Sequence, residues 1–244
     1  MMVKLDMQWS NLREDIRRWG LIKALYLRAM RRVEKRLGFR LFVIHTRRLD
    51  PNTREEETPT GCSARLLTVD ELIKFALDPA LDLDSDAVAG AYARGDVCFG
   101  YLEQDTLVAY TWKSTVPTRA EDGLWVRFGE GYSYGYKAFT LPSHRGRHLQ
   151  EHLIHASEHW RMSHGSRYNI GYIDLLNLSS IAADRRYGNR AIGYAGYIKW
   201  FGLTFPFRSR GVKSSGFQFF IPEPARAPTI PTPTATSVPS EIRH

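Results

Sequence analysis

Residues 137–160 read KAFTLPSHRGRHLQEHLIHASEHW, and residues 168–202 read YNIGYIDLLNLSSIAADRRYGNRAIGYAGYIKWFG. A helix that begins directly after the Arg-Gly-Arg turn leaves its first backbone N–H groups without intrahelical acceptors, which makes this turn a natural anion site. Periodicity and turn residues predict, in order, strand 137–141, helix 147–163, strand 168–175, helix 178–187 and strand 191–199.

The preceding residues supply the other elements of a single domain. Thr68 and Glu71 have the spacing of a capping box at the start of a helix. Ser85 starts a second helix, and Gln104-Asp105-Thr106 joins the two strands of a hairpin. The sequence predicts strand 64–67, helices 70–77 and 85–94, strands 97–103, 107–114 and 124–128, and a last strand at 216–221.

This order of elements resembles the GNAT superfamily of N-acyltransferases over about residues 64–221. The resemblance implies an α/β (α+β) fold with a mixed central sheet flanked by helices. It also implies acetyl-CoA or another acyl-CoA as co-substrate, with a small-molecule or lipid amine as acceptor. The family's turn has the pattern Arg/Gln-x-x-Gly-x-Gly/Ala, and its backbone amides hold the CoA pyrophosphate. Here Arg145 matches the first position, whereas His148 and Gln150 replace the glycine or small residues.

A second match follows in the chain. Asn177-x-x-Ser180, with Gly188 eight residues later, resembles the family's Asn-x-x-Ala/Ser, helix and Gly-aromatic signature. Asn177 is equally suited to cap a helix without touching any ligand. The cofactor-binding residues that the resemblance implies are Phe139, Thr140, Leu141, Arg145, Gly146, Arg147, His148, Leu149, Gln150, Asn177 and Ser180.

The family's chemistry is direct attack of an amine on the thioester carbonyl. A strand amide polarises that carbonyl, and we expect it at about Leu141. A Tyr commonly protonates the thiolate, but that position holds Asp184. An ordinary carboxyl is ionised at neutral pH, so Asp184 acts only if burial raises its pKa; otherwise another group serves, or the thiolate leaves unassisted. Tyr187 lies roughly 300° further around the helix and is not an obvious substitute.

The Gly/Tyr segment before the turn is the expected acceptor site. Tyr132, Tyr134 and Tyr136 alternate, so they share one face if the segment is extended. Tyr136 is nearest the reactive end and is the second catalytic candidate. Ordinary sheet packing is the alternative for all three.

A row of histidines lies along the helix that follows the turn. His148, His152, His155 and His159 have spacings of four, three and four. Such spacing occurs in metal sites, but the core-facing stripe is predicted one residue further on, at Leu149, Leu153, Ala156 and Trp160. We therefore expect no metal.

The charge of the chain is concentrated at its start. The net charge is +8, of which residues 1–48 carry +9 (13 Lys/Arg and 4 Asp/Glu). A basic amphipathic helix is predicted from Ser10 to Gly38, with Gly20 as a kink or break. It either packs on its own domain or a partner chain, or lies on an anionic membrane surface. Nucleic acid is disfavoured, because stacking aromatics are not interleaved with the basic residues.

The expected organisation is an extension at 1–49, made of this helix and a strand at 39–44 that pairs with the main domain, a linker at 50–61, the domain at 62–221 and a disordered Pro/Thr-rich tail at 222–244. Two cysteines and no membrane-length apolar run favour the cytoplasm, with or without contact to the membrane surface. Two alternatives to an acetyl-CoA enzyme remain open. One is a long-chain acyltransferase at the membrane that uses acyl-CoA or acyl carrier protein. The other is a degenerate GNAT-like binding module.

Overall fold

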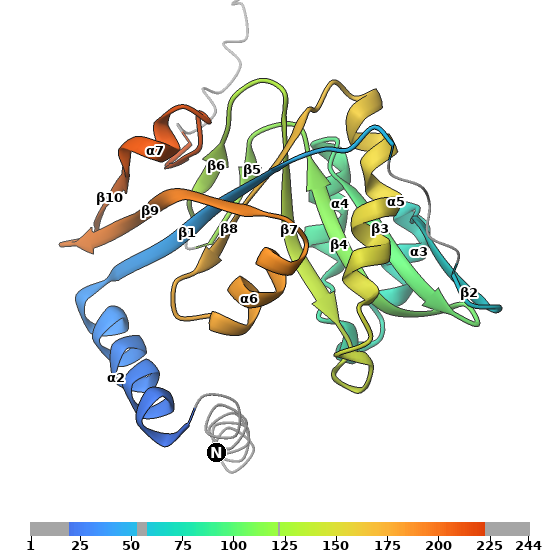
Figure 1. Ribbon diagram of the computed structural model, residues 1–244, viewed down its shortest axis with the longest axis horizontal. Coiled ribbons are helices and arrows are strands. Elements are labelled where there is room, and N and C mark those ends of the chain that lie inside the picture. The colour runs from blue at the N-terminus through green and yellow to red at the C-terminus, as the bar shows by residue number, and fades with distance from the viewer. Residues whose placement is uncertain (1–19, 53–57, 122, 223–244) are drawn as a thin grey trace, which may run out of the picture.

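The computed structural model describes residues 20–52, 58–121 and 123–222, and its centre is an eight-stranded mixed sheet (Figure 1). Every pair of neighbouring strands is antiparallel except β7 and β8, which are parallel. The strand order is β10 (Leu203–Arg208), β9 (Arg190–Trp200), β1 (Phe39–Arg48), β8 (Tyr168–Asp174), β7 (Tyr132–Thr140), β4 (Thr106–Ser114), β3 (Val97–Glu103) and β2 (Cys62–Leu66).

Helices cover both faces of the sheet. On one face, α3 (Val69–Phe75) and α4 (Ser85–Ala93) pack on β3 and β4. On the other, α5 (Leu149–Ser163) packs on β3 and β4 through Leu149 and Leu153. α6 (Leu178–Arg186) lies beside β1. The predicted capping box is present at the start of α3, where Thr68 and Glu71 bond each other's backbone.

Two strands that the sequence predicts in the main sheet form a second, smaller sheet. Its order is β11 (Gln218–Phe220), β6 (Trp125–Arg127) and β5 (Thr118–Arg119). Val126 and Phe219 are buried there against β1, β8 and β9, in the largest hydrophobic cluster. β10 is a strand that the sequence pattern did not predict. The short elements are η1 (Pro79–Leu81), η2 (Pro142–His144) and α7 (Arg210–Lys213).

Strand β1 lies inside the sheet rather than at its margin. It pairs with β8 from Phe42↔Asp174 to Arg48↔Tyr168, and with β9 on its other side. The strand predicted at 39–44 is present, is longer than expected and pairs with strands of the main domain. Its backbone is bonded on both edges, so residues 39–48 lie in the same sheet as the strands of residues 62–221.

Helix α2 (Leu21–Leu37) precedes β1. Gly20 stands at its N-cap with φ 81, and Gly38 ends it with φ 60. The earlier part of the expected basic helix, most of the linker and nearly all of the tail lie outside the described residues. Among the helices described, none has the length and apolar character needed to cross a membrane.

Phe42→Ala should destabilise the whole domain. Phe42 is fully buried and contacts the rings of Tyr172, Tyr197 and Phe219. Loss of such a ring costs about 3–5 kcal/mol of unfolding free energy, measurable by urea denaturation. Leu25→Ala, at an exposed position of α2, is the control and should change it by less than about 0.5 kcal/mol. Equal effects would contradict a central role for β1.

Candidate active site

The parallel strands β7 and β8 separate after their first residues. They pair only at Tyr132↔Tyr168, Ser133↔Asn169 and Tyr134↔Ile170, although β7 continues to Thr140 and β8 to Asp174. Beyond Tyr134 the facing edges of the two strands have no ladder between them. The sheet is thus open between two adjacent strands, with α5 and α6 beginning near the open end (Figure 1).

A β-bulge shapes the β7 side of this opening. Against β4, the pairing steps from Tyr110↔Phe139 to Trp112↔Tyr136, which leaves one extra residue on β7. Lys137 adopts φ 45 within the bulge, a left-handed conformation that non-glycine residues rarely take. The bulge bends the strand and re-aims its backbone groups.

The backbone amide that faces the opening is not the one expected from the sequence. The Leu141 N–H donates to Val108 O at 2.9 Å, so it points toward β4. Successive N–H groups of an extended chain alternate in direction, which turns the Thr140 N–H toward the opening. Thr140, not Leu141, therefore presents the amide suited to polarise a carbonyl.

Two adjoining cavities occupy the opening. The inner one has a volume of about 410 Å³ and is lined by β1, β4, β7, β8, α5 and α6. The outer one has a volume of about 810 Å³ and lies between the turn before α5 and helix α6. Residues common to both are Ala138, Gln150, Asn177, Ser180, Ala183 and Tyr187.

The turn at the mouth of the outer cavity offers unbonded amides. Within the described part of the chain, the backbone N–H groups of residues 146–150 donate to no acceptor. Arg145 and Gly146 line this cavity. His148 adopts φ 60, the left-handed conformation that glycine adopts at least cost, at a position where the family has glycine.

The side chains of this turn diverge. Arg147 turns away from the cavity and pairs with Glu103 at 2.6 Å, so its side chain does not line the site as expected. Gln150 Nε2 donates to Phe139 O at 2.7 Å and to Thr140 Oγ1 at 3.1 Å. Leu149 borders the cavity but is buried in the core. Arg186 of α6 lines the opposite wall, and the sequence analysis missed it.

Asn177 and Ser180 border both cavities. Asn177 Oδ1 accepts from the Ser180 N–H at 3.2 Å, so this side chain caps α6. Its capping role and its place on the cavity wall coexist, since the start of α6 itself faces the opening.

Asp184 lies in the inner cavity and is mostly buried, with 14% of its side chain exposed. Burial raises its pKa from the ordinary 3.8 to about 7, and the hydrogen bond from Asn189 and the charge of Arg47 only partly oppose this. His45 Nδ1 lies 3.1 Å from its Oδ1. Burial lowers the pKa of His45 to about 4, so the two do not form an ion pair at neutral pH. Asp184 is protonated for much of the time at neutral pH and is able to donate a proton.

The hydroxyl of Tyr136, which the sequence analysis names as a catalytic candidate, does not point freely into the cavity. Its ring borders the inner cavity, but its hydroxyl donates to buried Asp96 at 2.8 Å. Burial, together with Asp96, raises the pKa of this hydroxyl. The ring of Tyr134 stacks on that of Tyr136, and Tyr132 stacks on Tyr168. The tyrosine row is therefore mainly sheet packing, and the Tyr136 hydroxyl is already engaged.

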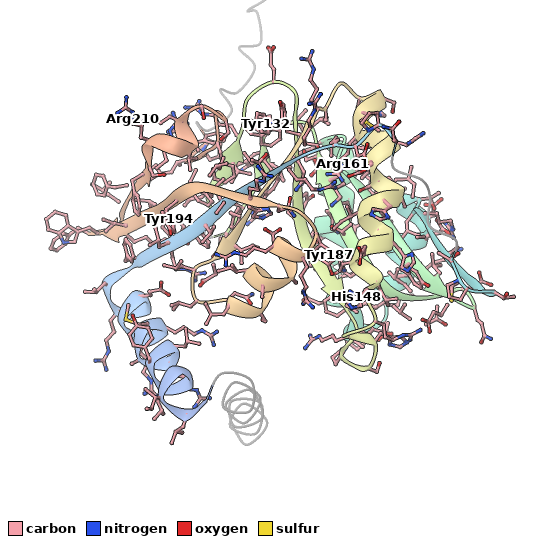
Figure 2. The ribbon with its side chains drawn as sticks, viewed as in Figure 1. Tyr132, His148, Arg161, Tyr187, Tyr194 and Arg210 are labelled. Carbon is pink, nitrogen blue, oxygen red and sulfur yellow. The ribbon has the colours of Figure 1, made fainter. Side chains whose placement is uncertain are left out.

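Tyr187 borders both cavities, contrary to the angular estimate (Figure 2). A displacement of 300° around a helix is only 60° in the other direction, so positions three apart share a face. Among the described residues, nothing hydrogen-bonds its hydroxyl. Tyr187 and Asp184 are thus both placed to deliver a proton into the opening.

The histidine row on α5 carries no metal cluster. Within the described ranges, no three His, Cys, Asp or Glu side chains lie close enough together to hold a metal ion. His148 is at the start of the helix, and the His152 ring lies 5.4 Å from that of Tyr101.

No protein-family model matches this chain, and no curated protein matches its sequence. Several of the solved structures that it resembles are described as GNAT-family or GCN5-related N-acetyltransferases. A GNAT-family protein from Novosphingobium aromaticivorans is 19% identical, with a TM-score of 0.45, 66% of this chain covered and 63% of the neighbour. A GCN5-related N-acetyltransferase from Sphaerobacter thermophilus is 14% identical, with a TM-score of 0.47 and coverages of 73% and 56%.

A third neighbour is the AAC(6')-Iy structure in complex with a CoA-containing bisubstrate analogue. It is 18% identical, with a TM-score of 0.42, 52% of this chain covered and 89% of that chain. This chain matches less than two thirds of the length of the first neighbours. At these scores and identities the neighbours do not identify a substrate for this chain.

Asp184→Asn should change how stability depends on pH. A carboxyl whose pKa is higher in the folded state contributes stability at low pH that is lost as pH rises toward the folded pKa. The difference in unfolding free energy, variant minus wild type, should therefore rise by roughly 2 kcal/mol from pH 5 to pH 7. Urea denaturation at the two pH values measures it. Asp86→Asn, at an exposed position of α4, should show no such trend. A flat difference for Asp184→Asn would contradict the raised pKa.

Proposed function

We propose that this protein is an N-acyltransferase that moves an acyl group from acyl-CoA, acetyl-CoA in the first instance, to an amine. The observation that carries the proposal is the opening between β7 and β8, which has unbonded amides of residues 146–150 at one end and the Thr140 amide along its wall. In this proposal the diphosphate of CoA binds on the turn before α5. Arg145 and Arg186 line the outer cavity there, from opposite sides. Amides at a helix start suit such an anion.

The chemistry follows from this placement. The acceptor nitrogen attacks the thioester carbonyl carbon while the Thr140 N–H stabilises the oxygen. The C–S bond then breaks, the nitrogen gives its surplus proton to water as the amide forms, and the CoA thiolate takes a proton. Tyr187 or protonated Asp184 supplies that proton, since both border the inner cavity. Holding donor and acceptor together contributes much of the rate.

Isothermal titration calorimetry should show that acetyl-CoA binds to the wild type. Arg145→Ala should weaken the affinity for acetyl-CoA about tenfold, because charge-assisted contacts to phosphate are strong. Arg147→Ala is the matched control. Its side chain pairs with Glu103 outside the cavity, so affinity should change less than about twofold, a factor worth roughly 0.4 kcal/mol. Absence of binding would overturn the proposed function. Binding without turnover on an amine panel would leave a binding module.

A second candidate places the same reaction at a membrane, with a long acyl group on CoA or acyl carrier protein. One surface favours it, the hairpin tip, defined as Trp200, Phe201 and Leu203. These side chains are 65%, 88% and 62% exposed. The tip lies beside the end of α2, because the Lys199 N–H donates to Gly38 O at 2.8 Å. Exposed arginines of α2 supply positive charge, which anionic lipid attracts. These arginines are Arg31, Arg32 and Arg36.

Trp200→Ser with Phe201→Ser should abolish sedimentation with vesicles containing phosphatidylglycerol. Large apolar side chains at the tip would enter the lipid interface, and serine would not. Leu77→Ser is the control, since Leu77 is 81% exposed at the end of α3. It should sediment like the wild type. Wild-type protein that stays in the supernatant would rule out the membrane version and leave the acyl-CoA proposal intact.

A further inference from the structure

A cluster of buried charged side chains forms the closed end of the inner cavity. Lys113 of β4 is 5% exposed, Arg161 of α5 is 1% exposed and Glu158 is fully buried. Asn169 of β8 and Arg47 of β1 complete the cluster. Burial of a charged group costs free energy unless an ion-pair or hydrogen-bond partner compensates it.

The cations are only partly compensated. Arg47 pairs with Glu158, which Arg161 approaches at 4.0 Å. Arg161 also donates to Asn169 Oδ1 at 2.9 Å, while its buried Nε has no acceptor among the described residues. The Lys113 ammonium has three protons, and Nζ donates one hydrogen bond, to Thr111 Oγ1 at 3.1 Å. Glu158 is thus the carboxylate that the described contacts place against these basic side chains, and donors of Lys113 and Arg161 have no acceptor among the described residues.

Burial is the main cause that lowers the pKa of Lys113 well below its ordinary value, and the charge of Arg161 adds to the shift. On the α6 side of the cavity, burial raises the pKa of Asp184 to about 7. An anion placed between Lys113 and Arg161 would engage the unused donors and favour the charged amine.

The inner cavity, of about 410 Å³, reaches the cluster, because Lys113, Arg161 and Asn169 are among the residues that line it. Gly135 lies opposite Lys113 in the β4–β7 pairing. A Cβ at Gly135 would come within 3.3 Å of both Lys113 Nζ and Asn169 Oδ1, so a larger residue would crowd these two groups at the cavity wall.

We propose that this cluster is a binding site for a carboxylate carried by a substrate, held by Lys113 and Arg161. The inference rests on the proposed acyltransferase function and names its substrate class. The carboxylate belongs either to a dicarboxylic acyl group on the donor or to an amino acid acceptor. Both have the same chemistry, and the experiment separates them.

The test measures dissociation constants by calorimetry for two matched pairs of ligands. Succinyl-CoA against acetyl-CoA probes the donor, and L-phenylalanine against 2-phenylethylamine probes the acceptor. In the wild type, the carboxylate-bearing member of one pair should bind at least tenfold more tightly. Lys113→Met should abolish this preference and weaken the other member less than twofold.

Two controls keep the outcome unambiguous. Lys74→Met removes an exposed lysine of α3 and should retain the preference. Lys113→Gln is the second variant, should the methionine perturb the core, and thermal melts establish that both fold. A preference absent in the wild type, or retained in both Lys113 variants, would overturn the carboxylate site while acetyl-CoA binding upholds the acyltransferase. Failure of acetyl-CoA to bind would overturn the acyltransferase, and the phenylalanine pair would still decide whether a carboxylate binds.

Discussion

The fold depends on a parallel strand pair that is bonded at only three positions. β7 and β8 separate after Tyr134 and Ile170, so their facing backbone groups must find other partners. The bulge at Lys137 turns β7 further out of register with β4. Two helices begin at the end of this opening, and residues at the start of both, Gln150 of α5 and Ser180 of α6, line the same cavities. The separation of the β7 and β8 backbones therefore creates the cavity, and the side chains that line it determine its detailed shape.

The N-terminal strand links the integrity of the sheet to the site. β1 fills the sheet between β8 and β9, and it alternates its two faces in the usual way. Phe42 and Ile44 enter the core against the small sheet, whereas His45 and Arg47 border the inner cavity. A strand that ends at Arg48, far before β4 begins at Thr106, thus supplies part of the cavity wall.

Burial acts in opposite directions on the two sides of that cavity. On the α6 side it favours the protonated form of Asp184, and on the α5 side it favours the neutral amine of Lys113. Both shifts reduce buried charge. A charged ligand in the cavity would therefore change the protonation of both groups.

The sequence by itself determined the local elements: the capping box at Thr68, helix α5 after its basic turn, and the order strand, helix, strand, helix over residues 132–186. These follow from periodicity and capping, which act over a few residues; the sequence predicts the first of these strands at 137–141, and the structure begins it earlier, at Tyr132. Only the tertiary structure decided that β1 is central, that the Thr140 amide and not that of Leu141 faces the opening, and that Arg147 turns toward Glu103. It also decided that Glu158 and Arg161, predicted off the apolar stripe of α5, are buried. Each depends on strand register or on a charge partner distant in the chain, and no local pattern encodes either.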